Sequence, residues 1–272
     1  YRLGGDERLL ALVRERFAAY CARAQTVNFA NYNWFGRPQW TEPCGVVDSL
    51  MLAQDLFGET GERSWLRLAN LIFFNGLLSS QRENGGFGCD SCVTRDGRQP
   101  LLEAHKGAYE AYWCCSMRGA EGLMAAAHGG AFEREGEIVL ALRGAGRYSL
   151  EQAEVQIRGD FPWEEKVEIA FTGVRAPFML RVLLPQGVQA CDWPEGARRE
   201  ENDLLLRVAR DGVVSLALEM PVRREALPGG GHTLWRGDLL LGGGDEASAQ
   251  PVALRQHWAR EALERRPLRL IF

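Results

Sequence analysis

The sequence predicts an α + β protein of more than one domain, in which helices come first and an antiparallel β-sandwich follows. Apolar residues in the first half recur every three or four positions, the spacing of amphipathic helices. Beyond about residue 132 they alternate, and turn residues separate short segments rich in β-branched side chains. We therefore expect a helical domain over 1–131, a β-sandwich domain over 132–243, and a C-terminal tail with a short helix over 244–272.

Capping residues predict where the helices begin and end. Asp6 precedes an amphipathic stretch and is a suitable N-cap, because its side chain can accept a hydrogen bond from an unpaired backbone N–H. Pro43 suits the first position of a helix, where a missing N–H costs nothing. Gly58 is expected to stop that helix, and Gly129 to follow the last one. The four helices are expected over residues 6–24, 43–57, 62–78 and 116–127.

Short segments with alternating apolar residues predict strands in the second half. Turn residues separate them, and their regular spacing is typical of an antiparallel sandwich. The glycine-rich stretches PGGGH and GGGD are expected to be loops. The strand segments are EIVLALRG, YSLEQAEVQIRG, KVEIAFTG, FMLRVLLP, LLLRVARDG and VVSLALEMPV.

The composition is that of a globular protein without a nucleic-acid or membrane partner. The 272 residues are 46% hydrophobic and 25% charged, and the net charge of −4 gives no reason to expect a basic surface. No apolar run approaches the roughly 20 residues that span a bilayer. The polar start of the chain lacks the apolar segment of a signal peptide. An oligomer is compatible with this composition.

The cysteines indicate metal binding or thiol chemistry rather than a disulfide framework. Their number is odd and two of them are adjacent, whereas disulfide-rich secreted domains are usually shorter and evenly paired. We therefore expect a reducing compartment, and hence a cytoplasmic location. The seven are Cys21, Cys44, Cys89, Cys92, Cys114, Cys115 and Cys191.

Glu42 and Cys44 flank Pro43 at an expected helix start, which makes both of them candidate metal ligands. The positive end of the helix dipole favours a carboxylate and lowers the pKa of a thiol, so Cys44 should be more ionised than an ordinary cysteine. Cys114 and Cys115 stand just before another expected helix start. Because thiolates and carboxylates are zinc ligands, these four side chains could complete one tetrahedral zinc site.

Other interpretations of the cysteines stay open. Free cysteines are among the most buried residues, so each could be an ordinary core residue. Cys89 and Cys92 have the spacing of half a zinc knuckle, of which Cys114 and Cys115 could be the other half. The same Cys-x-x-Cys pair could serve redox chemistry or zinc storage, although the redox interpretation needs a thioredoxin-like βαβ context that the sequence does not suggest.

Motifs in both halves resemble the zinc-dependent β-L-arabinofuranosidase family of glycoside hydrolases. That family carries Glu-x-Cys at a helix start, then Tyr-Asn-Gly, then a Cys-Cys pair. In the second half, RGDFPWEEKVEIAF, MPVRR and WRGDLLL resemble strand motifs of the family, so the likeness covers nearly the whole chain. The matching residues of the first half are Glu42-Pro43-Cys44, Phe74-Asn75-Gly76 and Cys114-Cys115.

The resemblance implies an (α/α)6 barrel followed by β-sandwich domains, with this chain carrying the C-terminal half of the barrel. It implies a Zn²⁺ ion held by Glu42, Cys44, Cys114 and Cys115, and a carbohydrate substrate. It also implies a retaining mechanism, in which the zinc-bound thiolate of Cys114 attacks the anomeric carbon and a glutamate acts first as acid and then as base.

The chain departs from this family at two carboxylates. The family's acid/base glutamate falls on Thr26, and a substrate-binding glutamate falls on Asn70. These departures leave open a non-catalytic carbohydrate-binding relative whose zinc is structural. The candidate replacements for the lost carboxylates are Asp90, Glu103 and Glu110; His105 could contact sugar or metal, and Asp90, His105 and Glu110 are the candidate substrate-binding residues.

Overall fold

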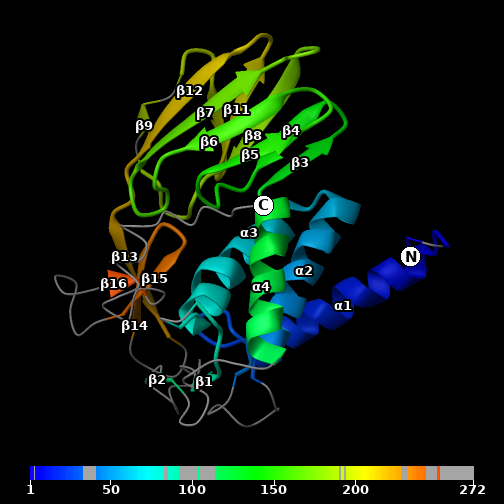
Figure 1. The fold of residues 1–272 in the computed structure, drawn as a ribbon, viewed down its shortest axis with the longest axis vertical. Helices are drawn as coiled ribbons and strands as arrows, with labels where there is room; N and C mark the ends of the chain where they lie inside the picture. The colour runs from blue at the N-terminus through cyan, green and yellow to red at the C-terminus, as the bar shows by residue number, and fades with distance from the viewer. Residues whose placement is uncertain are drawn as a thin grey trace.

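In the computed structural model, the described residues form a helical region, two facing five-stranded sheets and a separate four-stranded sheet (Figure 1). Figure 1 shows the two five-stranded sheets above the helices, and the four-stranded sheet beside the helices. The predicted α + β architecture is therefore confirmed. The structure describes residues 1–2, 4–32, 41–82, 85–91, 103–104, 114–189, 191–192, 194–227, 232–242 and 250–251.

The helices of the described part lie close to their predicted ranges. Asp6 caps the first one, since its carboxylate accepts the backbone N–H of Arg8 at 3.0 Å. The second does not stop at Gly58; it ends at Gly61, which adopts a left-handed φ of 70° and donates its N–H to the Phe57 carbonyl. None of these helices combines the length and apolar character that a membrane span requires. Their bounds are α1 Glu7–Ala24, α2 Pro43–Thr60, α3 Arg63–Leu71 and α4 Cys114–His128.

The third expected helix changes geometry partway along. After α3 the chain widens into a π-helix, η1 (Ile72–Leu77), and tightens into a 3₁₀ turn, η2 (Leu78–Ser80). Asn75, within η1, donates to the Asp238 carbonyl at 2.9 Å and accepts the Leu240 N–H at 2.8 Å. A Cβ on Gly76 would lie 2.6 Å from the backbone oxygen of Phe29. The Asn-Gly motif is thus explained by packing.

The two five-stranded sheets, called the paired sheets below, run in the orders β10-β11-β8-β4-β3 and β5-β6-β7-β12-β9. Neighbours are antiparallel except β4 and β8, which are parallel, so the expected antiparallel pairing fails at one place. The strands are β3 Ala131–Arg134, β4 Glu137–Leu140, β5 Gly146–Ser149, β6 Glu154–Arg158, β7 Lys166–Thr172, β8 Phe178–Leu183, β9 Cys191–Asp192, β10 Arg198–Glu200, β11 Asp203–Val208 and β12 Gly212–Leu218.

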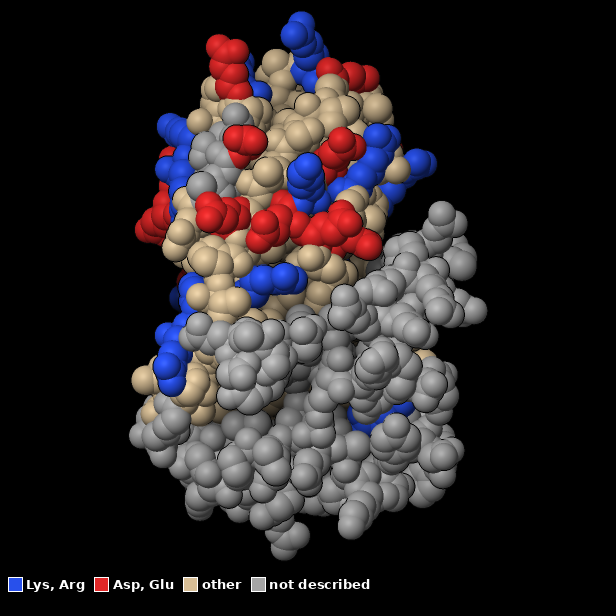
Figure 2. Space-filling view, turned by 90° about the vertical axis from the view of Figure 1, so that its left-hand side faces the viewer, with Lys and Arg blue, Asp and Glu red and all other residues tan. Residues whose placement is uncertain are grey.

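One apolar core fills the space between the paired sheets. Ile138 and Leu180 face it from one sheet, and Val155, Ile169 and Leu216 face it from the other. Buried residues alternate with more exposed ones along β6 and β12, which gives the sequence its period of two. In β4 three consecutive residues are buried, because Val139 packs in a second cluster with Phe57 and Leu66 of the helices. On the outer surface seen in Figure 2, acidic and basic side chains are interspersed, in keeping with the small net charge.

The four-stranded sheet packs against the helices rather than against the paired sheets. Leu234, Leu239 and Leu241 join one buried cluster with Val47 and Leu50 of α2. Its first three strands fall within the range expected for the sandwich, yet they form a separate sheet. The strands are β13 Val222–Ala226, β14 His232–Arg236, β15 Leu239–Gly242 and β16 Gln250–Pro251; a two-stranded pair, β1 Asp90–Ser91 with β2 Glu103–Ala104, lies apart from them.

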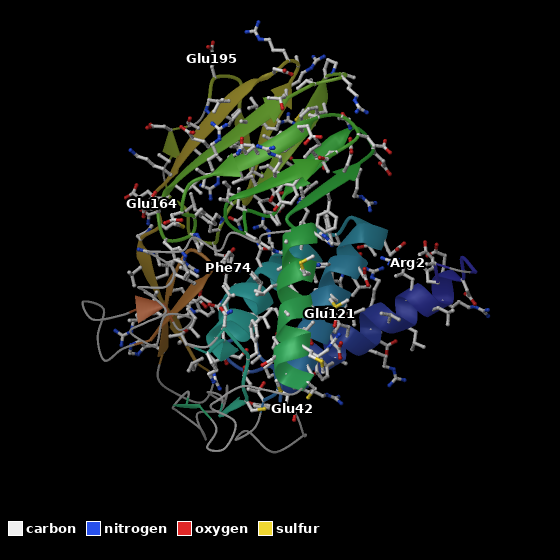
Figure 3. All side chains as sticks on the ribbon, in the orientation of Figure 1. Arg2, Glu42, Phe74, Glu121, Glu164 and Glu195 are labelled. Atoms are coloured by element: carbon white, nitrogen blue, oxygen red, sulfur yellow. The ribbon has the colours of Figure 1, made fainter. Side chains whose placement is uncertain are left out.

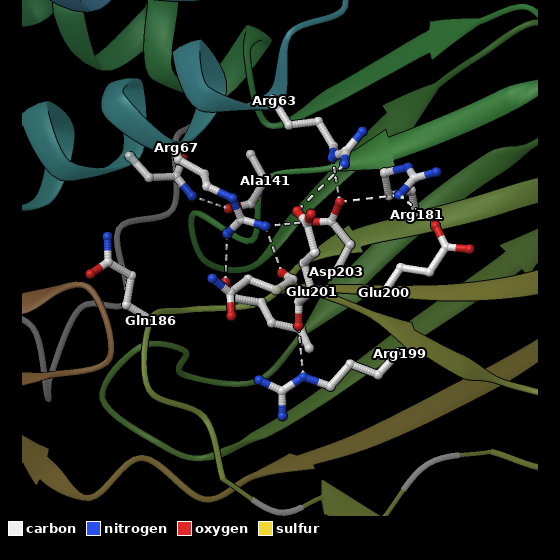
Figure 4. Close-up of polar contacts among 12 residues, drawn as sticks. Arg63, Arg67, Ala141, Arg181, Gln186, Arg199, Glu200, Glu201 and Asp203 are labelled. Carbon is white, nitrogen blue, oxygen red and sulfur yellow. Dashed lines mark hydrogen bonds and ion pairs between the residues drawn. The ribbon is translucent and has the colours of Figure 1, made fainter.

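A buried carboxylate joins the helices to the paired sheets. Asp203, at the start of β11, has a side chain only 1% exposed. Its carboxylate forms ion pairs with Arg63 (2.6 Å) and Arg67 of α3, and with Arg181 (3.1 Å) of β8 (Figure 4). Arg63 and Arg67 therefore attach α3 to β11 through this carboxylate, and Arg181 of the neighbouring strand β8 shares the same acceptor.

Candidate functional site

Three thiols meet where two helices begin. Cys44 lies in the first turn of α2, and Cys114 and Cys115 lie in the first turn of α4. Their sulfur atoms are all within 4.8 Å of one another. Cys115 is buried, Cys44 is partly buried and Cys114 is exposed, so one sulfur of the cluster faces solvent.

Close helix packing brings the two helix starts together. Gly122 of α4 lies so near α2 that a Cβ there would be 2.6 Å from a methyl carbon of Val47. At the start of α2, the Asn31 amide donates to the Gly45 carbonyl at 2.6 Å and to the Ser49 hydroxyl at 2.7 Å. The backbone that carries Cys44 is thereby held in place.

A fourth thiol adjoins the cluster. The Cys89 sulfur lies 3.9 Å from that of Cys115, and both residues are buried. Cys92, the second member of the Cys-x-x-Cys pair, lies outside the described residues. This contact supports one part of the zinc-knuckle alternative, in which Cys89 and Cys92 bind metal together with Cys114 and Cys115.

Burial and mutual contact raise the pKa of two of these thiols, Cys44 and Cys115, in the metal-free protein. Burial, followed by the neighbouring thiols of Cys114 and Cys115, raises the pKa of Cys44 to about 12. The hydrogen bond with Cys89, followed by burial, raises the pKa of Cys115 above its usual range. The expectation that the helix start makes Cys44 more ionised is therefore wrong, because desolvation of a buried thiolate outweighs the helix dipole.

The donor set fits zinc. Tetrahedral ligands at a Zn–S distance of about 2.3 Å lie about 3.8 Å apart, and the three sulfurs are already gathered within 4.8 Å. Soft thiolate donors also favour zinc over the hard cations Mg²⁺ and Ca²⁺. Because Cys44 and Cys115 have raised pKa values and hold protons without metal, zinc binding has to release those protons.

Glu42 stands at the N-cap of α2, two residues before Cys44. Figure 3 shows it at the end of the helices that is farthest from the paired sheets. Its negative charge contributes to the raised pKa of Cys115, after the larger effects of Cys89 and burial. Among the described residues, the group that converges within 4.8 Å consists of the three cysteines and does not include Glu42, so its role as the fourth ligand stays a prediction.

The weaker candidates fall largely beyond the described chain. His105 and Glu110 lie outside the described residues. Asp90 is described through its backbone, which pairs with Ala104, and Glu103 pairs in the same ladder. The substrate-binding roles given to Asp90, His105 and Glu110 therefore stay predictions.

The two positions that depart from the family are both buried. Thr26 has no exposed surface, and its hydroxyl donates to the Asn28 side-chain oxygen at 2.8 Å. Asn70 donates to the Ala141 carbonyl at 2.7 Å and accepts from Arg143 at 2.8 Å. Both side chains are engaged in structural hydrogen bonds, and neither is a carboxylic acid that could transfer a proton.

Gly119 lets the segment before the thiol cluster pack onto α4. A Cβ at Gly119 would lie 2.1 Å from the ring of Phe87. Gly119→Ala should therefore lower the free energy of unfolding by about 1–3 kcal/mol, the usual cost of overpacking. Chemical denaturation measures this change.

Gly58→Ala is the matched control, because its Cβ would meet open space within a helix. It should gain about 0.4–1 kcal/mol. Equal stability of the two variants would contradict the close packing of Phe87.

Comparison with solved structures identifies relatives of the fold. The chain is similar to a GH127 β-L-arabinofuranosidase from Geobacillus stearothermophilus T6, with a TM-score of 0.64 and 14% identity over 87% of this chain and 44% of that one. It is also similar to a glycoside hydrolase, with a TM-score of 0.59 and 18% identity over 74% of this chain and 37% of that one. A GH127 β-arabinofuranosidase gives a TM-score of 0.59 and 14% identity over 80% of this chain and 40% of that one. No protein-family model and no curated protein matches. At these identities the likeness shows a shared fold, and the chain spans less than half the length of each structure.

Proposed function

We propose that this chain is part of a glycoside hydrolase that cleaves furanosides at a zinc–cysteine site. The observation that carries the proposal is the convergence of Cys44, Cys114 and Cys115 at the adjoining starts of α2 and α4. The fold shared with a β-L-arabinofuranosidase supports it, because that likeness extends over 87% of the chain.

The proposal includes the architecture that this function implies. The helices within 1–131 would form the C-terminal half of an (α/α)6 barrel. The paired sheets would form the β-sandwich of the second domain that the sequence predicts over 132–243, except that residues 222–242 belong to the separate four-stranded sheet, and 244–272 would be a tail. Coverage of less than half of each solved structure is in keeping with a partial barrel.

Cys44, Cys114 and Cys115 would hold the zinc ion. One tetrahedral position is then left for a fourth donor, for which the sequence predicts Glu42. Bound zinc would stabilise the thiolate form of the three sulfurs, and at Cys44 and Cys115 it would replace the protons that they hold without metal.

Cys114 is the residue proposed to attack the sugar, because it is the exposed sulfur of the cluster. Its sulfur would form a bond to the anomeric carbon while the bond from that carbon to the leaving oxygen breaks. The leaving oxygen would depart with the bonding electrons and take its proton from water, since Thr26 cannot supply one. A second water molecule would then attack the anomeric carbon and lose a proton to solvent, while the carbon–sulfur bond breaks and its electrons return to the Cys114 thiolate. Two inversions would retain the configuration.

A non-catalytic carbohydrate-binding protein with a structural zinc is the second candidate. Thr26 supports it, since this residue occupies the place of the acid and is fully buried. A structural zinc site has four protein ligands, whereas catalysis needs a sulfur that can reach the substrate. The two candidates therefore differ in what Cys114 does.

Substrates with different leaving groups test the catalytic proposal. General acid help is typically worth about 10²–10⁴ in rate, and Thr26 cannot supply it. We expect the full-length protein that contains this chain to cleave activated aryl furanosides, whose leaving groups need no proton. It should cleave natural furanosides about 10²–10⁴ times more slowly. Initial rates on matched aryl and alkyl furanosides measure the difference.

Cys44→Ser is the control, because it removes a metal ligand without touching the proposed nucleophile. It should lower both rates together with the zinc content. Equal rates on the two substrate classes would mean that another residue is the acid. Cleavage of neither, with one zinc bound per chain, would favour the non-catalytic candidate.

A further inference from the structure

Contacts of the backbone around Cys89 fix the place of its thiol. The Arg82 guanidinium, which is buried, donates to the Cys89 carbonyl at 2.9 Å and to the Ser80 carbonyl at 3.0 Å. The backbone N–H of Phe87 donates to the Ser116 hydroxyl at 3.2 Å. The segment before β1 is thereby attached to the first turn of α4, which carries Cys115.

The position that results is suited to a metal ligand. The two sulfurs lie 3.9 Å apart, close to the edge of about 3.8 Å that tetrahedral zinc–thiolate geometry requires. Without metal the two sulfurs are joined to each other by a weak S–H···S contact. Cys115 is also a member of the three-sulfur cluster, so it is the neighbour that Cys89 and the cluster share.

We propose that Cys89 is the fourth zinc ligand, so that the resting site consists of the sulfurs of Cys44, Cys89, Cys114 and Cys115. This inference rests on the proposed zinc site and replaces its predicted oxygen donor, Glu42, with sulfur. The buried pair Cys89 and Cys115 anchors the ion from the protein side. The exposed Cys114 completes the shell on the solvent side.

X-ray absorption at the zinc edge counts the donors directly. The zinc-loaded full chain should show four sulfurs at about 2.3 Å and no oxygen at about 2.0–2.2 Å. In Cys89→Ser one sulfur should be replaced by an oxygen. The affinity for zinc should fall by at least about tenfold, because losing even a residue that only hydrogen-bonds to a metal ligand commonly lowers the affinity that much.

Two controls keep the test specific. Glu42→Gln should leave all four sulfurs in place, and Cys21→Ser makes the same chemical change outside the cluster. Substitution of cobalt for zinc gives a second readout, because the thiolate-to-cobalt absorption should fall by about a quarter in Cys89→Ser if four thiolates bind. Thermal unfolding without metal separates a ligand effect from a folding defect.

Each other outcome overturns a defined statement. Three sulfurs and one oxygen in the wild type, unchanged in Cys89→Ser and altered in Glu42→Gln, would exclude Cys89 and keep the proposed zinc site. Failure of the wild type to bind zinc or cobalt would remove the zinc site itself, and with it the role of Cys89.

Discussion

Asp203→Ala is expected to lower the free energy of unfolding by about 3–5 kcal/mol, the range found when one partner of a buried ion pair is removed. The carboxylate is 1% exposed and accepts from Arg63, Arg67 and Arg181. Without it, the three guanidinium groups lose their shared buried acceptor. The carboxylates that remain near Arg63 and Arg181 are those of Glu137, Glu200 and Glu201, which are more exposed. Urea denaturation followed by circular dichroism measures the change.

An exposed ion pair is the matched control. Glu225→Ala breaks the contact with Arg223, in which the glutamate side chain is 47% exposed. Exposed pairs contribute at most about 1 kcal/mol, so this variant should be nearly as stable as the wild type. A loss of similar size in both variants would mean that Asp203 is solvated in solution and does not hold α3 on the paired sheets.

Cys114→Ser is expected to lower the turnover of activated aryl furanosides by at least about 10³-fold, because removing a nucleophile commonly costs that much or more. A serine hydroxyl at this place is neither ionised nor as nucleophilic as a thiolate. The same substitution should prevent covalent labelling by an electrophilic furanose analogue, which in the wild type adds one label at Cys114. Intact-protein mass spectrometry and peptide mapping measure the labelling.

Cys21→Ser again provides the comparison, with unchanged turnover and labelling. Its thiol lies on α1 and is not part of the three-sulfur cluster. If Cys114→Ser retains turnover, or if the label attaches at Cys44, the exposed sulfur is not the nucleophile. The division of roles within the cluster would then have to be reversed.

The local patterns of the sequence predicted the elements well and their partners less well. Periodicity located α1, α2 and the strands of the paired sheets, because each buries one face. It could not predict that β4 and β8 run parallel, or that β13 to β15 leave the paired sheets. Strand pairing of this kind depends on contacts with distant segments that have similar apolar faces. The sequence of a single strand does not determine it.

The candidate site divides along the same line. The clustering of Cys44 with Cys114 and Cys115 followed from their places at two helix starts and from the family motifs. The pKa of Cys44 was predicted in the wrong direction, since burial is a tertiary property. The contact between Cys89 and Cys115 also depends on tertiary packing, through Phe87 and Gly119.

The hydrogen bonds of Asn75 with Asp238 and Leu240 have a consequence for the order in which the molecule folds. Asn75 and Leu240 are 165 positions apart, yet their hydrogen bond lies inside the helical core, beside Leu239 and Leu241. During synthesis the helices emerge long before these leucines do. The ribosome therefore releases the paired sheets while the helical core is still incomplete, and contacts of such long range are slow to form. Until the last strands are made, the part of the helical region that Leu234, Leu239 and Leu241 cover stays exposed to solvent.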